Sequence, residues 1–232
     1  MTTPSAADVR MLPPGMIQPR RAQLPGNCSR RWRSQMEKDG ARPGIEVYIT
    51  QRAYVRICAH AGSDLNNEVG GWLIGKWRAD RTTGAQFIVI EAVLPALHTR
   101  SGGAFLTFTQ DTQVELYNTM KERHPRKELV GWYHTHPRMG VFLSEYDTWL
   151  HRHFFAEPYQ VALVVEPHSV TGGFFIRQAD GWLDPRSYYG FYELINRRKR
   201  SVVHWRNVFT EEDVTPGETA PARATPAALE ME

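Results

Sequence analysis

Between residues 45 and 180, strand-like and helix-like runs alternate, and this alternation limits the possible folds more than any other feature of the chain. Residues 45–50 favour a strand, residues 51–65 have the spacing of an amphipathic helix, and residues 69–77 are apolar enough for a buried strand. Strands interleaved with helices, several of them joined as hairpins, indicate a mixed sheet covered by helices. We therefore predict an α/β (α+β) fold built on one mixed β-sheet flanked by helices.

The same alternation continues towards the C-terminus. Further strands are predicted at residues 86–94, 104–109, 128–136, 159–166 and 172–178, and further helices at residues 113–123, 144–156 and 188–200. With 232 residues, 41% of them hydrophobic, the chain can bury one full core but not two. We therefore expect a single domain.

The two ends of the chain differ in composition from this central region. Residues 1–44 contain six of the 15 prolines and carry a charge of +5, whereas residues 210–232 carry a charge of −5 in a run rich in Ala, Thr and Pro. Segments of this kind bury too little apolar surface to offset the entropy lost on ordering. We predict a basic, Pro-rich flexible arm at 1–44, one domain at 45–209 and an acidic disordered tail at 210–232.

Charge, cysteine content and hydropathy exclude several classes of function. A net charge of +3 is too small to predict binding to nucleic acid or to an anionic membrane. The two cysteines, Cys28 and Cys58, cannot form a disulfide framework or a thiolate zinc cluster. The sequence contains neither an apolar secretion signal nor an apolar run long enough to span a membrane. We expect a cytoplasmic protein that binds neither nucleic acid nor membranes.

Two histidines at the end of a predicted strand are candidate metal ligands. His134 and His136 are two residues apart, and the period of two places both imidazoles on one face. Asp147 follows after a segment long enough for the first turn of a helix to return over the strand end. Two imidazoles and a carboxylate suit a catalytic zinc, which keeps three protein ligands and a water. The histidine pair alone would favour a simpler interpretation, one buried and one exposed histidine.

The start of the following helix also has a purely structural interpretation. Ser144 and Asp147 can form a capping box, which satisfies free backbone amides without any metal, and Ser144 can serve both purposes. His151 and His153 repeat the His-x-His text, but residues i and i+2 of a helix point about 200° apart. For His151 a polar helix face is the favoured interpretation, with an extra surface metal or a supporting hydrogen bond as alternatives.

The order of these residues resembles the pattern of one family. HTHP at 134–137 and SEYD at 144–147 match the His-x-His-Pro and Asp signature of the JAB/MPN metallopeptidases, also called JAMM proteases. Ten residues separate the second His from the Asp, and Ser144 occupies the family's inner Ser position. The family also places a glutamate in a segment similar to E-x-x-G-x-L-x-G, and NNEVGGWLIG supplies Glu68 in that setting. The resemblance spans residues 45–180.

The resemblance implies a single MPN/JAB domain with a cytidine-deaminase-like fold and one catalytic Zn²⁺ held by His134, His136 and Asp147. Glu68 is then expected to act as general acid and base on the attacking water. Ser144 is expected to donate a hydrogen bond to the developing oxyanion. Without the family, Glu68 would be interpreted as a solvated charge at the edge of a strand.

Active members of that family mostly cut after the C-terminal Gly-Gly of ubiquitin or a ubiquitin-like protein, so the resemblance implies a metalloprotease, an isopeptidase or precursor-processing hydrolase, with such a substrate. The compact catalytic segment resembles bacterial deubiquitinase-like members, which act beside activating and conjugating enzymes of a ubiquitin-like pathway. Residues 97–109 are the candidate wall for the extended substrate tail. Two alternatives remain: a hydrolase for a sulfur-carrier or short peptide tail, and a non-catalytic MPN scaffold.

Overall fold

The computed structural model describes residues 18–37, 43–96, 99–102, 105–108, 110–195 and 200–210. Its helices are α1 (Gln51–Ala61), α2 (Gln110–Arg123) and α3 (Glu145–Phe154), together with the short 3-10 turn η2 (Gly26–Cys28). Its strands are β1 (Arg20–Ala22), β2 (Ser29–Ser34), β3 (Glu46–Thr50), β4 (Gly70–Asp80), β5 (Gln86–Pro95), β6 (Thr99–Gly102), β7 (Phe105–Phe108), β8 (Glu128–Thr135), β9 (Val161–Glu166), β10 (Thr171–Phe175), β11 (Phe191–Leu194) and β12 (Val208–Phe209).

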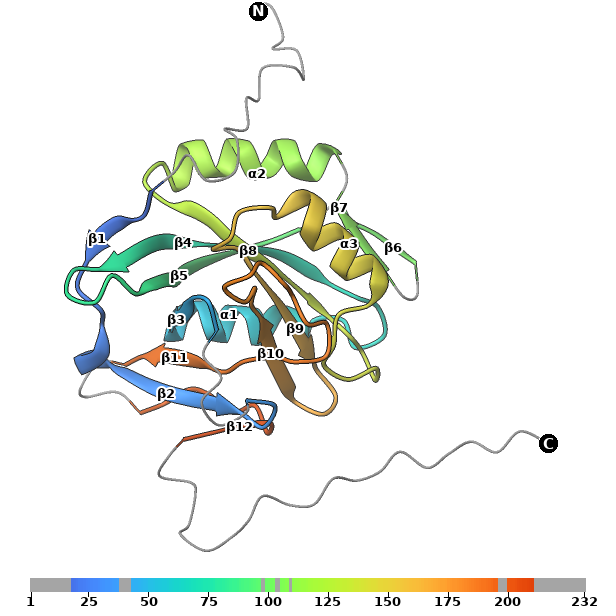
Figure 1. Ribbon diagram of the computed structural model, residues 1–232. Coiled ribbons are helices and arrows are strands. Elements are labelled where there is room, and N and C mark those ends of the chain that lie inside the picture. The colour runs from blue at the N-terminus through green and yellow to red at the C-terminus, as the bar shows by residue number, and fades with distance from the viewer. Residues whose placement is uncertain are drawn as a thin grey trace, which may run out of the picture.

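Most of the strands form one sheet in the order β10-β9-β8-β4-β5-β3-β11-β2-β12, and β1 pairs with the last residues of β4 (Figure 1). Neighbours β8 and β9, β3 and β5, and β3 and β11 run parallel. The other neighbours along this path are antiparallel. Strands β6 and β7 form a separate hairpin. The predicted mixed sheet flanked by helices is confirmed.

Helix α1 covers one face of the sheet. Thr50 caps its N-terminus, because the Thr50 hydroxyl accepts a hydrogen bond from the Ala53 amide at 3.3 Å. The apolar positions of the helix recur every three or four residues and are buried: Ala53, Tyr54, Ile57 and Ala61. They belong to a core that also contains alternate residues of β9: Val161, Leu163 and Val165.

Helix α3 covers the opposite face. The intervening residues of β9, Ala162 and Val164, belong to a second core together with Leu150 of α3 and the indoles of Trp72 and Trp132. Every residue of β9 is buried, and the side chains of its first five residues enter the two cores in turn. This arrangement explains why the segment is a continuous apolar run, and it places the end of β8 beneath the start of α3 (Figure 1).

The prediction that residues 1–44 form a flexible arm is wrong for the part that contains β1 and β2. β1 pairs with β4, and β2 pairs with both β11 and β12. The Trp32 indole N–H donates to Glu193 Oε2 at 3.2 Å, and the Arg31 guanidinium lies over the Tyr192 ring. This strand is difficult to predict from the sequence, because SRRWRS is rich in basic residues and its pairing partners in β11 lie more than 150 positions away. The domain therefore begins before residue 45.

The predicted helix at 188–200 is also wrong. This region contains β11, which runs between β3 and β2 and buries Phe191 and Glu193, while its other two residues are partly exposed. With only four residues, β11 is too short for its alternating pattern to be recognised within a segment rich in Tyr, Arg and Lys. Residues 1–17 and 38–42 of the predicted arm, residues 196–199, and residues 211–232 of the predicted tail lie outside the described residues.

Both cysteines are free thiols, Cys28 exposed and Cys58 partly buried. Burial raises the pKa of the Cys58 thiol to about 11, so it stays protonated and unreactive near neutral pH. Among the described residues, none of the helices has the length and apolar character needed to cross a membrane.

Candidate metal centre

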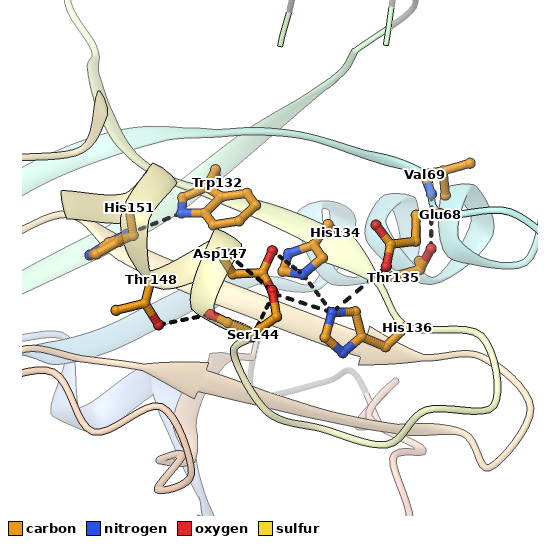
Figure 2. A network of polar contacts seen from close by, with 10 residues as sticks. All are labelled: Glu68, Val69, Trp132, His134, Thr135, His136, Ser144, Asp147, Thr148 and His151. Carbon is orange, nitrogen blue, oxygen red and sulfur yellow. Dashed lines mark hydrogen bonds and ion pairs between the residues drawn. The ribbon is translucent and has the colours of Figure 1, made fainter. Parts of the chain in front are cut away.

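The end of β8 brings two histidines to one buried position. His134 belongs to the strand and pairs with Gly70 of β4 on one side and Val164 of β9 on the other. His136 follows the strand, and its amide continues the ladder by donating to the Val165 carbonyl at 2.9 Å. Both histidines are buried, and their Nε2 atoms lie only 2.9 Å apart. The extended backbone thus turns both imidazoles towards the same point (Figure 2).

Helix α3 brings a carboxylate to the same point. Ser144 caps the helix: its hydroxyl accepts from the Asp147 amide at 3.1 Å, while Asp147 Oδ2 accepts from the Ser144 amide at 2.8 Å. The capping box suggested by the sequence is therefore present. It does not replace the metal-ligand interpretation, because Asp147 Oδ1 lies 3.3 Å from His134 Nε2 and Oδ2 lies 3.5 Å from His136 Nε2. The box holds the carboxylate where it faces both imidazoles.

The spacing of these atoms fits one small cation. His134, His136 and Asp147 each offer a ligand atom, and these atoms lie within 4.8 Å of one another. Atoms bound tetrahedrally at about 2.0–2.2 Å from zinc are about 3.3–3.6 Å apart. The observed separations of 2.9, 3.3 and 3.5 Å need only a small adjustment to reach that arrangement. Two imidazole nitrogens and a carboxylate oxygen are also a donor set that zinc accepts.

Burial and nearby charges set the protonation states of His134 and Asp147. Burial lowers the pKa of His134, although the Asp147 carboxylate opposes this shift. Burial alone would raise the pKa of Asp147, but the charge of His134 and hydrogen bonds from both histidines and Ser144 hold it well below its usual range. Near neutral pH the site therefore presents a neutral His134 imidazole and an ionised carboxylate, the forms that bind metals.

Glu68 lies at the rim of this group, immediately before β4. Its neighbour Val69 is tied to β8: the Val69 amide donates to Thr135 Oγ1 at 2.9 Å (Figure 2). Glu68 is buried, and its Oε1 lies 3.9 Å from His136 Nε2. Burial, aided by the Asp147 charge and opposed by His136, raises the pKa of the Glu68 carboxyl to about 7. A carboxyl that titrates near neutral pH is suited to accept and return a proton.

Two residues that the sequence did not assign to the site lie directly behind it. The Trp132 ring stacks on the His134 ring with 4.6 Å between centroids and 7° between planes. The Trp132 indole N–H donates to His151 Nδ1 at 3.0 Å. His151 is buried, so the interpretation of this residue as part of a polar helix face is wrong. Their spacings were the available signal: Trp132 is two residues before His134 on a strand, and His151 is one helical turn after Asp147.

The segment predicted to form a wall for the substrate tail lies partly outside the described residues. Within residues 97–109 the described backbone forms the β6–β7 hairpin, which pairs Thr99 with Phe108 and Gly102 with Phe105. Its role in substrate binding stays a prediction.

Comparison with known proteins finds a matching family model and several similar proteins. Residues 43–157, about half of the chain, match the JAB family model, described as JAB1/Mov34/MPN/PAD-1 ubiquitin protease. The 26S proteasome non-ATPase regulatory subunit 14 of Drosophila melanogaster is 29% identical over 55% of this chain and 40% of that protein. The COP9 signalosome complex subunit 5a of Arabidopsis thaliana is 32% identical over 55% of this chain and 35% of that protein.

A shorter match is to the NAD(+) hydrolase TcpA of Theionarchaea archaeon, 35% identical over 29% of this chain and 21% of that protein. The chain thus spans about a fifth to two fifths of the length of these curated relatives. The family match covers α1, β4, β8 and α3, the elements that carry or border the candidate metal centre. On this evidence the chain belongs to the JAB/MPN family.

Proposed function

We propose that this protein is a zinc metallopeptidase that hydrolyses the peptide or isopeptide bond after the C-terminal glycine of a ubiquitin-like protein. The observation that carries the proposal is the convergence of His134, His136 and Asp147 at one buried point beside Glu68, a carboxyl with a pKa near 7. His134 Nε2, His136 Nε2 and the Asp147 carboxylate would hold the zinc. When bound, zinc would lower the pKa of a coordinated water and polarise the scissile carbonyl.

Glu68 supplies the proton transfers that hydrolysis needs. As the water oxygen attacks the carbonyl carbon, the Glu68 carboxylate accepts a proton from the water. When the C–N bond breaks, Glu68 returns this proton to the leaving amine, which departs neutral. The second proton of the water remains on the new carboxyl group of the ubiquitin-like protein and is lost to solvent when that group ionises. The side chain is free for this work, because Glu68 Oε2 is buried without a hydrogen-bond partner among the described residues.

Ser144 is the candidate donor to the oxyanion. Its hydroxyl now donates to Asp147 Oδ2 at 2.7 Å while accepting from the Asp147 amide. Rotation about its Cβ–Oγ bond would turn the hydroxyl hydrogen away from the carboxylate, while Oγ continues to accept from the Asp147 amide. In that orientation the hydroxyl would stabilise the negative charge that develops on the carbonyl oxygen.

The substrate class is supported by the family match, because the family is described as a ubiquitin protease. A ubiquitin-like protein joined through an isopeptide bond must first have its C-terminal carboxylate activated, because a carboxylate does not form an amide unaided. We therefore extend the proposal to a pathway in which activating and conjugating enzymes make the bond that this hydrolase removes, and we place that pathway in the cytoplasm of a bacterium.

The test combines metal analysis with a cleavage assay on the full chain. Purified protein should contain one zinc per chain and should release the C-terminal extension from a ubiquitin-like fusion, with mass spectrometry locating the cut after the terminal glycine. The double variant His134→Ala with His136→Ala should lose the zinc, because one remaining carboxylate does not hold it at useful affinity.

Three other outcomes would each contradict one part of the proposal: the ligands, the activity or the substrate. Unchanged zinc in the double variant would overturn the ligand assignment. A zinc-loaded protein that cuts no fusion, even when a matched panel of ubiquitin-like proteins and sulfur carriers is offered, would support a scaffold. Cleavage confined to sulfur-carrier or short peptide tails would keep the chemistry and replace the substrate.

A further inference from the structure

In the part of the chain that the structure describes, no group forms the hydrogen bond that usually orients a metal-binding histidine at His134. Such a residue ordinarily donates its second ring N–H to a carboxylate, a carbonyl or a water. Here His134 Nε2 faces the other candidate ligands, while Nδ1 is buried and has no partner among the described residues. Among the described residues, the groups that can orient the His134 ring at this side are therefore those that pack against it.

The ring packed against His134 is Trp132. The two rings are nearly parallel, 7° between planes and 4.6 Å between centroids, and neither residue is exposed. Trp132 also stacks with Phe155, with 5.6 Å between centroids and 16° between planes. Stacking restrains the tilt of the indole, but it does not by itself prevent the indole from sliding or rotating within its plane.

His151 restrains the indole within its plane. Its Nδ1 accepts the Trp132 indole N–H at 3.0 Å, and His151 is itself only 1% exposed and packed against Phe155. Because Nδ1 accepts, the ring proton of neutral His151 is on Nε2, away from the metal centre (Figure 2). His151 lies one turn beyond Asp147 on α3, whereas Trp132 lies two residues before His134 on β8. The hydrogen bond therefore links the two elements that provide the candidate ligands, and it does so without needing a metal.

We propose that His151 is a positioning residue of the metal centre, which orients His134 through the stacked indole of Trp132 and sets how tightly zinc is held. The inference rests on the proposed zinc site. It assigns to the His151–Trp132 pair the supporting role that a carboxylate or carbonyl plays at other zinc-bound histidines. Loss of such support typically weakens metal binding about 10- to 100-fold.

Two substitutions of similar shape separate hydrogen bonding from packing. His151→Asn keeps an acceptor, since the Asn Oδ1 occupies the same place along the side chain as the imidazole Nδ1. His151→Leu has the same number of side-chain heavy atoms and the same branching as the Asn variant, and it offers no acceptor. Zinc affinity, measured on the full chain by competition with a chelator, should fall about 10- to 100-fold for His151→Leu. It should stay close to the wild-type value for His151→Asn.

The absorption spectrum of the cobalt-substituted protein gives a readout that a general loss of stability would not change. Its visible bands depend on the geometry of the ligands, so they should shift in His151→Leu and return towards the wild-type positions in His151→Asn. Trp132→Phe removes the donor while keeping a stacked ring, and it should shift the bands in the same way as His151→Leu. If His151→Leu does not fold, Trp132→Phe decides the question.

The outcomes separate this inference from the proposed function. Wild-type affinity and spectrum in both His151→Leu and Trp132→Phe would overturn the positioning role while leaving the zinc site intact. Equal weakening in the Leu and Asn variants would also overturn it, because packing alone would then explain the effect. A wild-type protein that binds no zinc would overturn the zinc site itself, and the positioning role with it.

Discussion

Val69 and Thr135 are joined by two hydrogen bonds, one donated by each residue's backbone amide. The Val69 amide donates to Thr135 Oγ1 at 2.9 Å, and the Thr135 amide donates to the Val69 carbonyl at 2.9 Å. Thr135 lies between the two candidate histidine ligands, and Val69 follows Glu68. This reciprocal pair therefore fixes the distance between the residue proposed to move the proton and the residues proposed to hold the metal.

Replacing Thr135 by Val should loosen Glu68 without removing any ligand. The change leaves the partly buried Val69 amide without its acceptor, which costs about 1 kcal/mol of folding free energy. Thr135→Val should still bind one zinc, but its single-turnover cleavage rate should fall, because Glu68 is no longer held at one distance from the water. Thr171→Val is a suitable control, since the Thr171 hydroxyl, at the start of β10, forms an exposed hydrogen bond with Ser169 Oγ away from the candidate metal centre. Equal rates for both variants would mean that the Val69–Thr135 pair does not position Glu68.

Glu166 organises the turn that follows the HTHP segment. Its carboxylate accepts three backbone N–H groups, from Arg138 and His168 at Oε1 and from Ser169 at Oε2, at 3.0, 2.9 and 2.6 Å. Burial alone would raise the pKa of Glu166, but these hydrogen bonds outweigh it and lower the pKa to about 2. Because the folded-state pKa lies below the ordinary value of 4.5, the stabilisation is complete above pH 4.5 and is lost as pH falls towards 2.

Glu166→Gln should therefore destabilise the protein in a pH-dependent way. At pH 7 the variant loses a charged acceptor and points an amide NH₂ at backbone donors, so the free energy of unfolding should drop by about 1–3 kcal/mol. Urea unfolding of both proteins across the acid range should show this gap closing as pH falls from 4.5 towards 2. A gap that stays constant over that range would show that Glu166 does not titrate as described.

The N-terminal boundary gives a prediction opposite to the one suggested by composition. Deleting residues 1–44 removes β2 from between β11 and β12 and takes away Trp32, which packs against the main core. Loss of a fully buried Trp costs about 3–5 kcal/mol. Trp32 is partly buried, so its loss costs less, but the pairing of β2 with two strands is lost with it and the melting temperature should fall sharply. Deleting residues 1–17, none of which is described in the structure, is the matched control. A stable protein after the longer deletion would show that β2 is dispensable.

Local patterns predicted the elements that carry the candidate site, because each obeys a short-range rule. The period of two put His134 and His136 on one face, and the Ser-x-x-Asp cap placed Asp147 in the first turn of α3. The assignment of Glu68 needed the family resemblance, since a lone acid before a strand has no distinctive local pattern. These roles remain proposals until metal and activity are measured.

What the sequence could not predict depends on contacts between distant residues. The Glu193 carboxylate is fully buried because it accepts from Trp32, Gln51 and Ser201, which come from separate segments of the chain. Without those partners in view, an acid beside a basic run indicates a solvated helix rather than a central strand. His151 was misplaced for the same reason: only the fold shows that the Trp132 indole meets it.

The proposed role of Glu68 is tested by Glu68→Gln, which keeps the size of the side chain and its hydrogen-bonding reach but removes the basic carboxylate. The variant should fold and bind zinc, since Glu68 is not a proposed ligand, but it should not hydrolyse a ubiquitin-like fusion. Ser144→Ala should retain more activity, because losing one oxyanion donor costs about 100- to 1000-fold in turnover. Zinc content must be measured on each variant so that lost metal is not mistaken for lost chemistry.

The pH dependence of the wild type gives a second test of the same role. The pKa of Glu68 is about 7 without a cation, and a nearby bound cation favours the carboxylate and lowers that value. Because the base must be ionised, single-turnover rates should rise with pH and level off at or below about pH 7, whereas Ser144→Ala should show the same limb at a lower rate. If zinc-loaded Glu68→Gln cleaves at the wild-type rate with that limb intact, another group accepts the proton, and the mechanism assigned to Glu68 is wrong.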